Sequence, residues 1–315
     1  MHLPSPRGSL SAILVDALRT ARPVRTEPSL ASSPEDAALA LWMLHELSYA
    51  GFSDVDEARE WQPDLLRLRH DLESELEDRL RARFPGAPES ASGDLVTAFF
   101  DYVESHEGPS VASHVHTDAT EEQAIELLRW RSVYHLKEAD PSSFVLARLP
   151  RAARAALAEL LYDEYGAGRP ERLHSQLFAE ALRSVGLDPD GRYVDEVPSE
   201  VLEMNNAVSM FGFQRRLRGA AMGHLAAFEC TSSVPARRLA QGFQRLELPQ
   251  PVIDYYTEHV VADAVHEQVT VRHILLPLVE ADPDQLEPVF LGAFTCLDQE
   301  ARTSRVLLER WDVAA

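Results

Sequence analysis

Apolar residues recur along most of this chain at the three- and four-residue spacing that marks one face of a helix. In the segment 63–84 this spacing is kept by four leucines, Leu65, Leu68, Leu72 and Leu76. A second helix is predicted to begin at Ser33, which can cap it, with Pro34 in its first turn and Gly51 as its stop. No segment alternates apolar and polar residues as a half-buried strand does. The pattern therefore predicts an all-α fold.

Helical spacing continues through the rest of the chain. The predicted helices cover residues 94–106, 118–137, 150–165, 171–185, 199–228, 251–278 and 285–310. The sequence GAGRP at 166–170 interrupts this pattern, because Gly and Pro both favour turns. A helical bundle is the natural architecture for such a chain, and bundle cores can hold metal sites built from Glu and His.

We expect three parts in the chain. Residues 1–32 are rich in Pro, Ser and Arg and are predicted to be poorly ordered. Residues 33–112 are predicted to form an extra N-terminal helical region, and residues 113–315 are predicted to form the main bundle. The N-terminal region is a candidate for covering the bundle or for forming a homodimer.

Targeting segments are not expected. The apolar stretch around Ile13 is interrupted by Asp16 and Arg19, so it does not have the pattern of a signal peptide. No run of about 18 apolar residues, the length that spans a membrane, occurs. We therefore expect a cytoplasmic protein.

Composition narrows the possible partners and metals. The chain has 315 residues, 45% of them hydrophobic, and a net charge of −21. Such acidity argues against binding to nucleic acid or to anionic membranes. The two cysteines, Cys230 and Cys296, are too few for a disulfide framework and form no C-x-x-C pair. A bound metal would therefore be held by His and carboxylate side chains.

The sequence HVVADAVH contains three possible metal ligands: His259, Asp263 and His266. On a helix their offsets of zero, four and seven residues fall within about 60° of one another. The residues between them are Val and Ala, so this helix is predicted to be largely buried. Burying three polar groups on one face is costly unless something satisfies them, and a metal ion does so. The competing interpretation is structural, because a single His on a helix is usually an ordinary surface or core residue.

A second cluster lies in DEYGAGRPERLH, where Glu164 precedes the glycine-rich break and His174 follows it. Ten residues separate the two, which on a regular helix would set them about 80° apart. The break at 166–170 can direct both side chains to one site. Glu171 is an alternative partner, since it lies three residues from His174 on one helix face. The plainer interpretation is a helix–loop–helix connection with solvated carboxylates.

Two further carboxylates are candidates. Glu229 follows Leu225, Ala226, Ala227 and Phe228, so it is predicted to be buried and then protonated, paired or metal-bound. Glu138 lies at a helix end before Pro141, where exposure is an equal alternative. Oxygen and nitrogen ligands of these kinds suit Fe(II) or Mn(II). The match to a ferritin-like pair of Glu-x-x-His motifs is only partial, so we expect a different dinuclear arrangement.

These motifs resemble the heme-oxygenase-like diiron oxidases, often called iron-containing redox enzymes. The resemblance covers about residues 121–311, and it rests on four motifs: LKEADP at 136–141, DEYGAGRPERLH at 163–174, GHLAAFE at 223–229 and HVVADAVH at 259–266. It implies a heme-oxygenase-like helical bundle that binds two Fe(II) ions and reacts with dioxygen. Heme is not expected, although His45 and His224 are conceivable proximal ligands.

The resemblance also implies a set of metal ligands, with no catalytic residue apart from them: Glu138, Glu164, His174, Glu229, His259, Asp263 and His266. The division of these ligands between the two irons stays open, as does the choice between Glu164 and Glu171. The implied activity is N-oxygenation, desaturation or oxidative C–C cleavage of an amine, amino acid or fatty acid. An external reductant is a possible partner.

Two other functions compete with the oxidase. One is a cofactor-free, thiaminase-like hydrolase on the same bundle, which would need a nucleophilic cysteine facing the pocket. Cys230 adjoins Glu229, but neighbouring residues on a helix point about 100° apart. The other is a non-enzymatic protein that stores metal or binds a partner through its helices.

Overall fold

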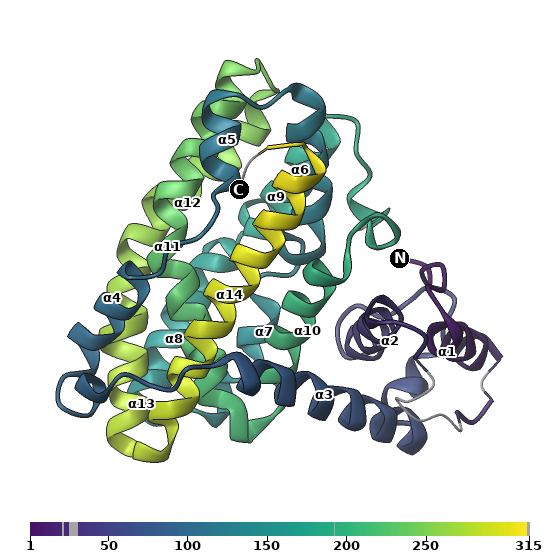
Figure 1. Cartoon of the computed structure of the whole chain (residues 1–315), viewed down its shortest axis with the longest axis horizontal. Coiled ribbons are helices and arrows are strands. Elements are labelled where there is room, and N and C mark those ends of the chain that lie inside the picture. Colours follow the sequence, from purple (N-terminus) through teal and green to yellow (C-terminus); the bar gives the residue numbers. More distant parts are fainter. Residues whose placement is uncertain (21, 25–30, 192, 314–315) are drawn as a thin grey trace.

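A computed structural model gives the fold of residues 1–20, 22–24, 31–191 and 193–313, with the side chains of 261–264 lying outside this description. Every regular element in these residues is a helix, as the sequence predicts. Three long helices, α11 (Arg218–Arg245), α12 (Gln250–Gln268) and α14 (Leu286–Arg310), run through the bundle (Figure 1). The helix α11 packs against both of the others and is the centre of the fold.

Glycines let α11 and α14 approach closely where they cross. A Cβ atom added at Gly223 would lie 1.9 Å from the carbonyl oxygen of Val289, and one added at Gly292 would lie 1.9 Å from that of Ala220. No real side chain tolerates such a distance, so only Gly permits this crossing. The close contact fixes α11 relative to the C-terminal helix.

Shorter helices complete the bundle around α11. They are α4 (Leu95–Glu104), α5 (Val111–Thr117), α6 (Glu121–His135), α7 (Asp140–Ser143), α8 (Arg151–Glu164), α9 (His174–Ser184), α10 (Ser199–Phe213) and α13 (Leu276–Ala281). The sequence pattern did not predict α5, which packs on α11. Since α4 and α5 both pack into the bundle, the predicted boundary at residue 112 is not a break in packing.

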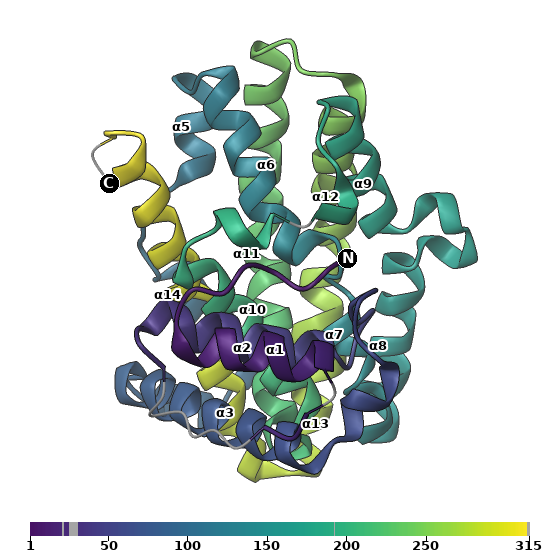
Figure 2. The ribbon, with the colours of Figure 1, turned by 90° about the vertical axis from the view of Figure 1, so that its right-hand side faces the viewer.

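The helices α1 (Ser9–Thr20), α2 (Pro34–Glu46) and α3 (Pro63–Arg83) lie together on one side of the bundle (Figure 2). The helix α2 packs on α10 and joins this region to the core. Ser33 caps α2 through its side chain, which confirms the predicted start.

The prediction that residues 1–32 are poorly ordered is wrong for 9–20, which form α1. Leu10, Leu14 and Leu18 are buried at helical spacing. The Asp36 carboxylate accepts hydrogen bonds from the backbone N–H groups of Leu10 and Ser11 and from the Ser11 hydroxyl. The Asp36 carboxylate on α2 therefore accepts hydrogen bonds from N–H groups in the first turn of α1, which have no partner within that helix.

Two predicted helices differ from the structure. The segment 199–228 is not one helix, because the chain leaves helical geometry at Gln214 and starts α11 after Leu217. The segment 251–278 is α12, a π-helical stretch from Val269 to Leu275, and α13. Single-turn π segments are rare and often lie at functional sites. Within the described ranges, no helix has the length and apolar character needed to cross a membrane.

Candidate metal centre

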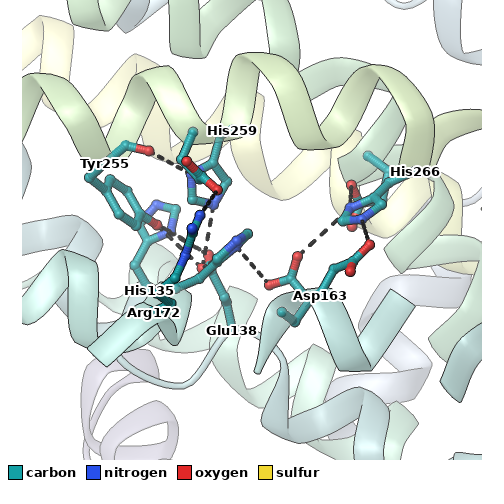
Figure 3. A network of polar contacts seen from close by, with 11 residues as sticks. His135, Glu138, Asp163, Arg172, Tyr255, His259 and His266 are labelled. Atoms are coloured by element: carbon teal, nitrogen blue, oxygen red, sulfur yellow. Dashed lines mark hydrogen bonds and ion pairs between the residues drawn. The ribbon is translucent and has the colours of Figure 1, made fainter. Parts of the chain in front are cut away.

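Six of the seven predicted ligands gather in two neighbouring groups of buried side chains. Figure 3 labels three of them, Glu138, His259 and His266. Each group consists of three side chains, and within each group one ligand atom from every residue lies within 4.8 Å of the others. The first group is Glu138, His174 and His259, and the second group is Glu164, Glu229 and His266. The seventh, Asp263, lies on α12 between the two histidines, but its side chain is outside the described residues.

The first group joins three separate elements. Glu138 lies in the turn between α6 and α7, His174 is the first residue of α9, and His259 comes from α12. Oε1 of Glu138 is 3.5 Å from Nε2 of His259 and 4.0 Å from Nδ1 of His174. One carboxylate oxygen therefore faces two imidazole nitrogens, with room between them for a metal ion.

The second group is built in the same way. His266, seven residues after His259 on α12, points toward Glu229 on α11 and Glu164 at the end of α8. Nδ1 of His266 is 3.3 Å from Oε2 of Glu229 and 3.8 Å from Oε1 of Glu164. The spacing predicted for one face of α12 thus places its two histidines in neighbouring groups.

Glu164 connects the two groups. Its Oε1 faces His266, while its Oε2 lies 3.1 Å from Nδ1 of His174. That nitrogen makes no hydrogen bond of acceptable geometry within the described residues, despite the short distance. Glu171 is exposed, so of the two candidates it is Glu164 that lies beside His174.

A sharp turn between α8 and α9 brings Glu164 and His174 together. Gly166, Ala167 and Gly168 all have positive φ angles, of 67°, 55° and 78°. A Cβ atom added at Gly166 would lie 2.5 Å from the backbone carbon of Arg172. Glycine is therefore required at 166 both for its φ angle and for the close return of the chain. The break that the sequence predicted does direct the two side chains to one place.

His135 and Tyr255 hold the first group in place. Nδ1 of His135 is 2.7 Å from Oε2 of Glu138 and 2.7 Å from the Tyr255 hydroxyl. Nδ1 of His259 donates to the carbonyl oxygen of Tyr255 at 2.8 Å. Because a carbonyl can only accept, the proton of a neutral His259 is on Nδ1, and Nε2 presents its lone pair to the site. Burial would raise the pKa of Glu138, but the hydrogen bond from His135 is the largest of the effects that outweigh it and hold the pKa well below its ordinary value.

Sequence reasoning missed both supporting residues. His135 stands three residues before Glu138, and Tyr255 stands four residues before His259. Residues at these spacings are neighbours on one face of a helix, so the spacing could have indicated both. Asp163 was missed as well, and its Oδ2 lies 3.5 Å from Nε2 of His266. No local pattern marks Asp163 as different from other carboxylates on α8.

The donor set fits a pair of divalent cations. Three buried carboxylates this close together repel one another unless positive charge lies between them. Imidazole and carboxylate donors suit iron, whereas none of the cysteine ligands that zinc structural sites prefer is present in either group. Glu164, with one oxygen toward each group, has the position of a bridging ligand.

Comparison with known proteins identifies the family. The family model described as iron-containing redox enzyme matches residues 125–301, more than half of the chain. The chain belongs to the iron-containing redox enzymes. This membership agrees with the all-α, heme-oxygenase-like bundle, and the matched range contains all four motifs that carry the candidate site residues.

A curated relative lies in the same family. The nitrosourea synthase of Streptomyces achromogenes subsp. streptozoticus is 33% identical to this chain over 156 residues. The matched part is 49% of this chain and 33% of that protein. The chain thus spans about a third of the length of this relative, which contains further sequence beyond the shared bundle.

Proposed function

We propose that this protein is a non-heme diiron oxygenase that uses dioxygen to oxidise a small organic substrate. The observation that supports it most directly is the position of Glu164, which faces an imidazole of each group with a different oxygen. A bridging carboxylate between two three-ligand groups is the expected arrangement for two irons rather than one. Family membership supports iron and redox chemistry, and the number of irons is part of the proposal.

Each side chain has a definite role in this proposal. The first group would hold one iron and the second group the other, with one oxygen of Glu164 toward each group. His135 and Tyr255 form hydrogen bonds with Glu138 and His259 and orient them. Residues that are hydrogen-bonded to metal ligands usually have this role. Iron bound by these residues would supply the redox chemistry that dioxygen activation needs. Asp263, whose side chain lies outside the described residues, stays a further proposed ligand on α12.

A cavity beside the first group offers a place for the substrate. Its volume is about 280 Å³, and His135, Tyr255 and His259 form part of its wall. Apolar residues from α6, α11 and α14 form much of the remaining wall, among them Leu127, Phe228 and Leu297. A molecule bound there would lie next to the proposed ligands of one iron, against a mainly apolar wall.

The name of the relative suggests which reaction to test first. It is a synthase of nitrosoureas, compounds that contain an oxidised nitrogen, so N-oxygenation of an amine is the first candidate. The hydrolase alternative has less support. Cys296 borders the cavity, but burial raises the pKa of its thiol, and burial raises the pKa of Cys230 to about 12. A protonated thiol is a weak nucleophile.

Anaerobic Fe(II) titration followed by exposure to dioxygen tests the proposal. Metal analysis is expected to give two irons per chain, and an oxygen electrode is expected to record uptake. Glu229→Ala and His266→Ala should lower the iron content while the helical circular dichroism spectrum is kept. His273→Ala, an exposed histidine that follows on the π-helical stretch, is the matched control and should retain both irons. A stoichiometry of one iron or none contradicts the proposal, and two irons without oxygen uptake favours metal storage.

A further inference from the structure

Among the described residues that line the cavity beside the first group, Arg131 and Glu300 form a charged pair. Arg131 of α6 and Glu300 of α14 face each other there, with Nη1 of Arg131 donating to Oε2 of Glu300 at 2.9 Å and Nη2 donating to Oε1. Four residues separate Arg131 from His135 on α6, a rise of about 6 Å. The charged pair therefore lies about one helical turn from the side chains that support the candidate metal centre.

The two members of this pair are not equally accessible. The Glu300 side chain is 41% exposed, whereas that of Arg131 is 18% exposed. Both terminal nitrogens of Arg131 are directed at Glu300, and the Ser304 side chain on the same helix donates to this carboxylate as well. A carboxylate has about four acceptor sites, so about one stays open to another donor. Burial would raise the pKa of Glu300, but the charge of Arg131 outweighs it and lowers the pKa, so the carboxylate is anionic.

Two further polar groups lie on the cavity wall. His224 and Tyr256 both border the cavity, and Nε2 of His224 and the Tyr256 hydroxyl have no hydrogen-bond partner within the described residues. Burial lowers the pKa of His224 to about 4, so its imidazole carries no charge at neutral pH. The charges of Arg131 and Glu300 cancel within the pair, but Glu300 is its more exposed member, so its carboxylate is the charged group that an incoming molecule meets first.

We propose that the cavity binds a molecule with an apolar body and a cationic nitrogen group, and that Glu300 is the residue that selects this charge. The inference rests on the proposed function, since it names the class of substrate for the same site. A carboxylate ligand would meet the exposed oxygens of Glu300 before it reached the Arg131 guanidinium, and like charges repel. An ammonium group would instead add a second charge-assisted partner to Glu300.

Hexylamine and hexanoate are a matched pair of probes, because they share an apolar chain and carry opposite charges at neutral pH. Calorimetric titration of the full chain, loaded anaerobically with Fe(II) and also without added metal, compares the two. Hexylamine is expected to bind at least about tenfold more tightly, a difference of about 1.4 kcal/mol. Equal binding, or tighter binding of hexanoate, overturns the proposal without any variant.

Variants assign the preference to Glu300. Glu300→Gln should remove the advantage of hexylamine, while Glu309→Gln, at an exposed position on the same helix, should keep it. The double variant Arg131→Leu/Glu300→Leu removes the pair together, in case the single change leaves Arg131 unpaired and the protein unfolded. A preference that survives both Glu300 variants contradicts the role given to this residue.

Iron content measured on the same samples separates this inference from the proposed function. A chain that binds two irons but shows no preference for hexylamine loses the substrate proposal alone. A chain that prefers hexylamine but binds no iron loses the oxygenase proposal alone.

Discussion

Nδ1 of His174 lies 3.1 Å from Oε2 of Glu164, although ten residues and a tight turn separate the two in the chain. The other oxygen of Glu164 faces His266, so this one carboxylate joins two groups that are otherwise built from different helices. Glu164 is thus the side chain through which the two groups are connected. Changes at or around it should affect iron binding more than changes elsewhere on α8.

Replacing Glu164 tests this link directly. Glu164→Gln is expected to lower the iron content from two per chain to one or none, with affinity reduced at least about a hundredfold, because the amide removes a bridging anionic ligand. Glu171→Gln is the control, since Glu171 is an exposed rival in the same loop. Metal analysis after gel filtration measures both. Equal iron content in the two variants would show that Glu164 is not a ligand.

Gly166 and Gly168 form a matched pair for testing the turn. Both have positive φ angles, but only Gly166 packs against the backbone, while a Cβ atom at Gly168 would meet nothing within 4 Å. Gly168→Ala should cost about 1 kcal/mol from strain alone. Gly166→Ala should cost more, because the backbone near Arg172 must move, and it should also weaken iron binding by displacing His174. Urea unfolding and iron titration of both variants check this, and equal effects would contradict it.

Lys137 anchors the N-terminal helices beside the candidate centre. Its Nζ lies 2.6 Å from Oε2 of Glu46 on α2, both side chains are buried, and the Tyr49 ring lies 4.3 Å from Nζ. Glu46→Leu or Lys137→Met alone should each destabilise the fold by about 3–5 kcal/mol, because one buried charge loses its partner. The double variant should recover most of this loss. A double variant whose free energy of unfolding equals the sum of the single losses would contradict the coupling.

The buried imidazole of His224 predicts a pH dependence. Burial lowers its pKa from 6.5 to about 4, so between these values the unfolded chain binds a proton that the folded chain does not. The stability contributed by neutral His224 is therefore complete above pH 6.5 and is lost as pH falls toward 4, by about 3 kcal/mol at most.

The variant His224→Gln isolates this contribution, since Gln does not titrate. Its free energy of unfolding should fall less steeply than that of the wild type between pH 6.5 and 4. His273→Gln is the control, because His273 is exposed and should leave the wild-type slope unchanged. Urea unfolding at a series of pH values provides the measurement, and parallel curves for the wild type and His224→Gln would contradict the assignment.

Local patterns predicted most of the helices but not the positions at which the helical segments are interrupted. The leucines of α3 and the cap at Ser33 follow directly from spacing and capping chemistry. The helix α5, the interruption before α11 and the π-helical stretch were not predicted. The helix α5 and the π-helical stretch both pack against α11, whose residues lie far from theirs in the chain.

The candidate centre shows the same division. HVVADAVH placed His259 and His266 on one helical face, and the glycine-rich break marked where Glu164 and His174 approach each other. The support given by His135 and Tyr255 depends on contacts between α6 and α12 across 117–120 residues of sequence. A single helix contains no signal for such partners.

The sequence by itself determined the all-helical class, the family motifs and the residues available to bind metal, because helix periodicity and ligand type are local properties. The tertiary structure decided that Glu164 rather than Glu171 meets His174, that Glu300 faces a cavity and that α1 packs on α2. These outcomes depend on distances between side chains from separate helices. Such distances follow from the packing of the whole bundle, which no local pattern contains.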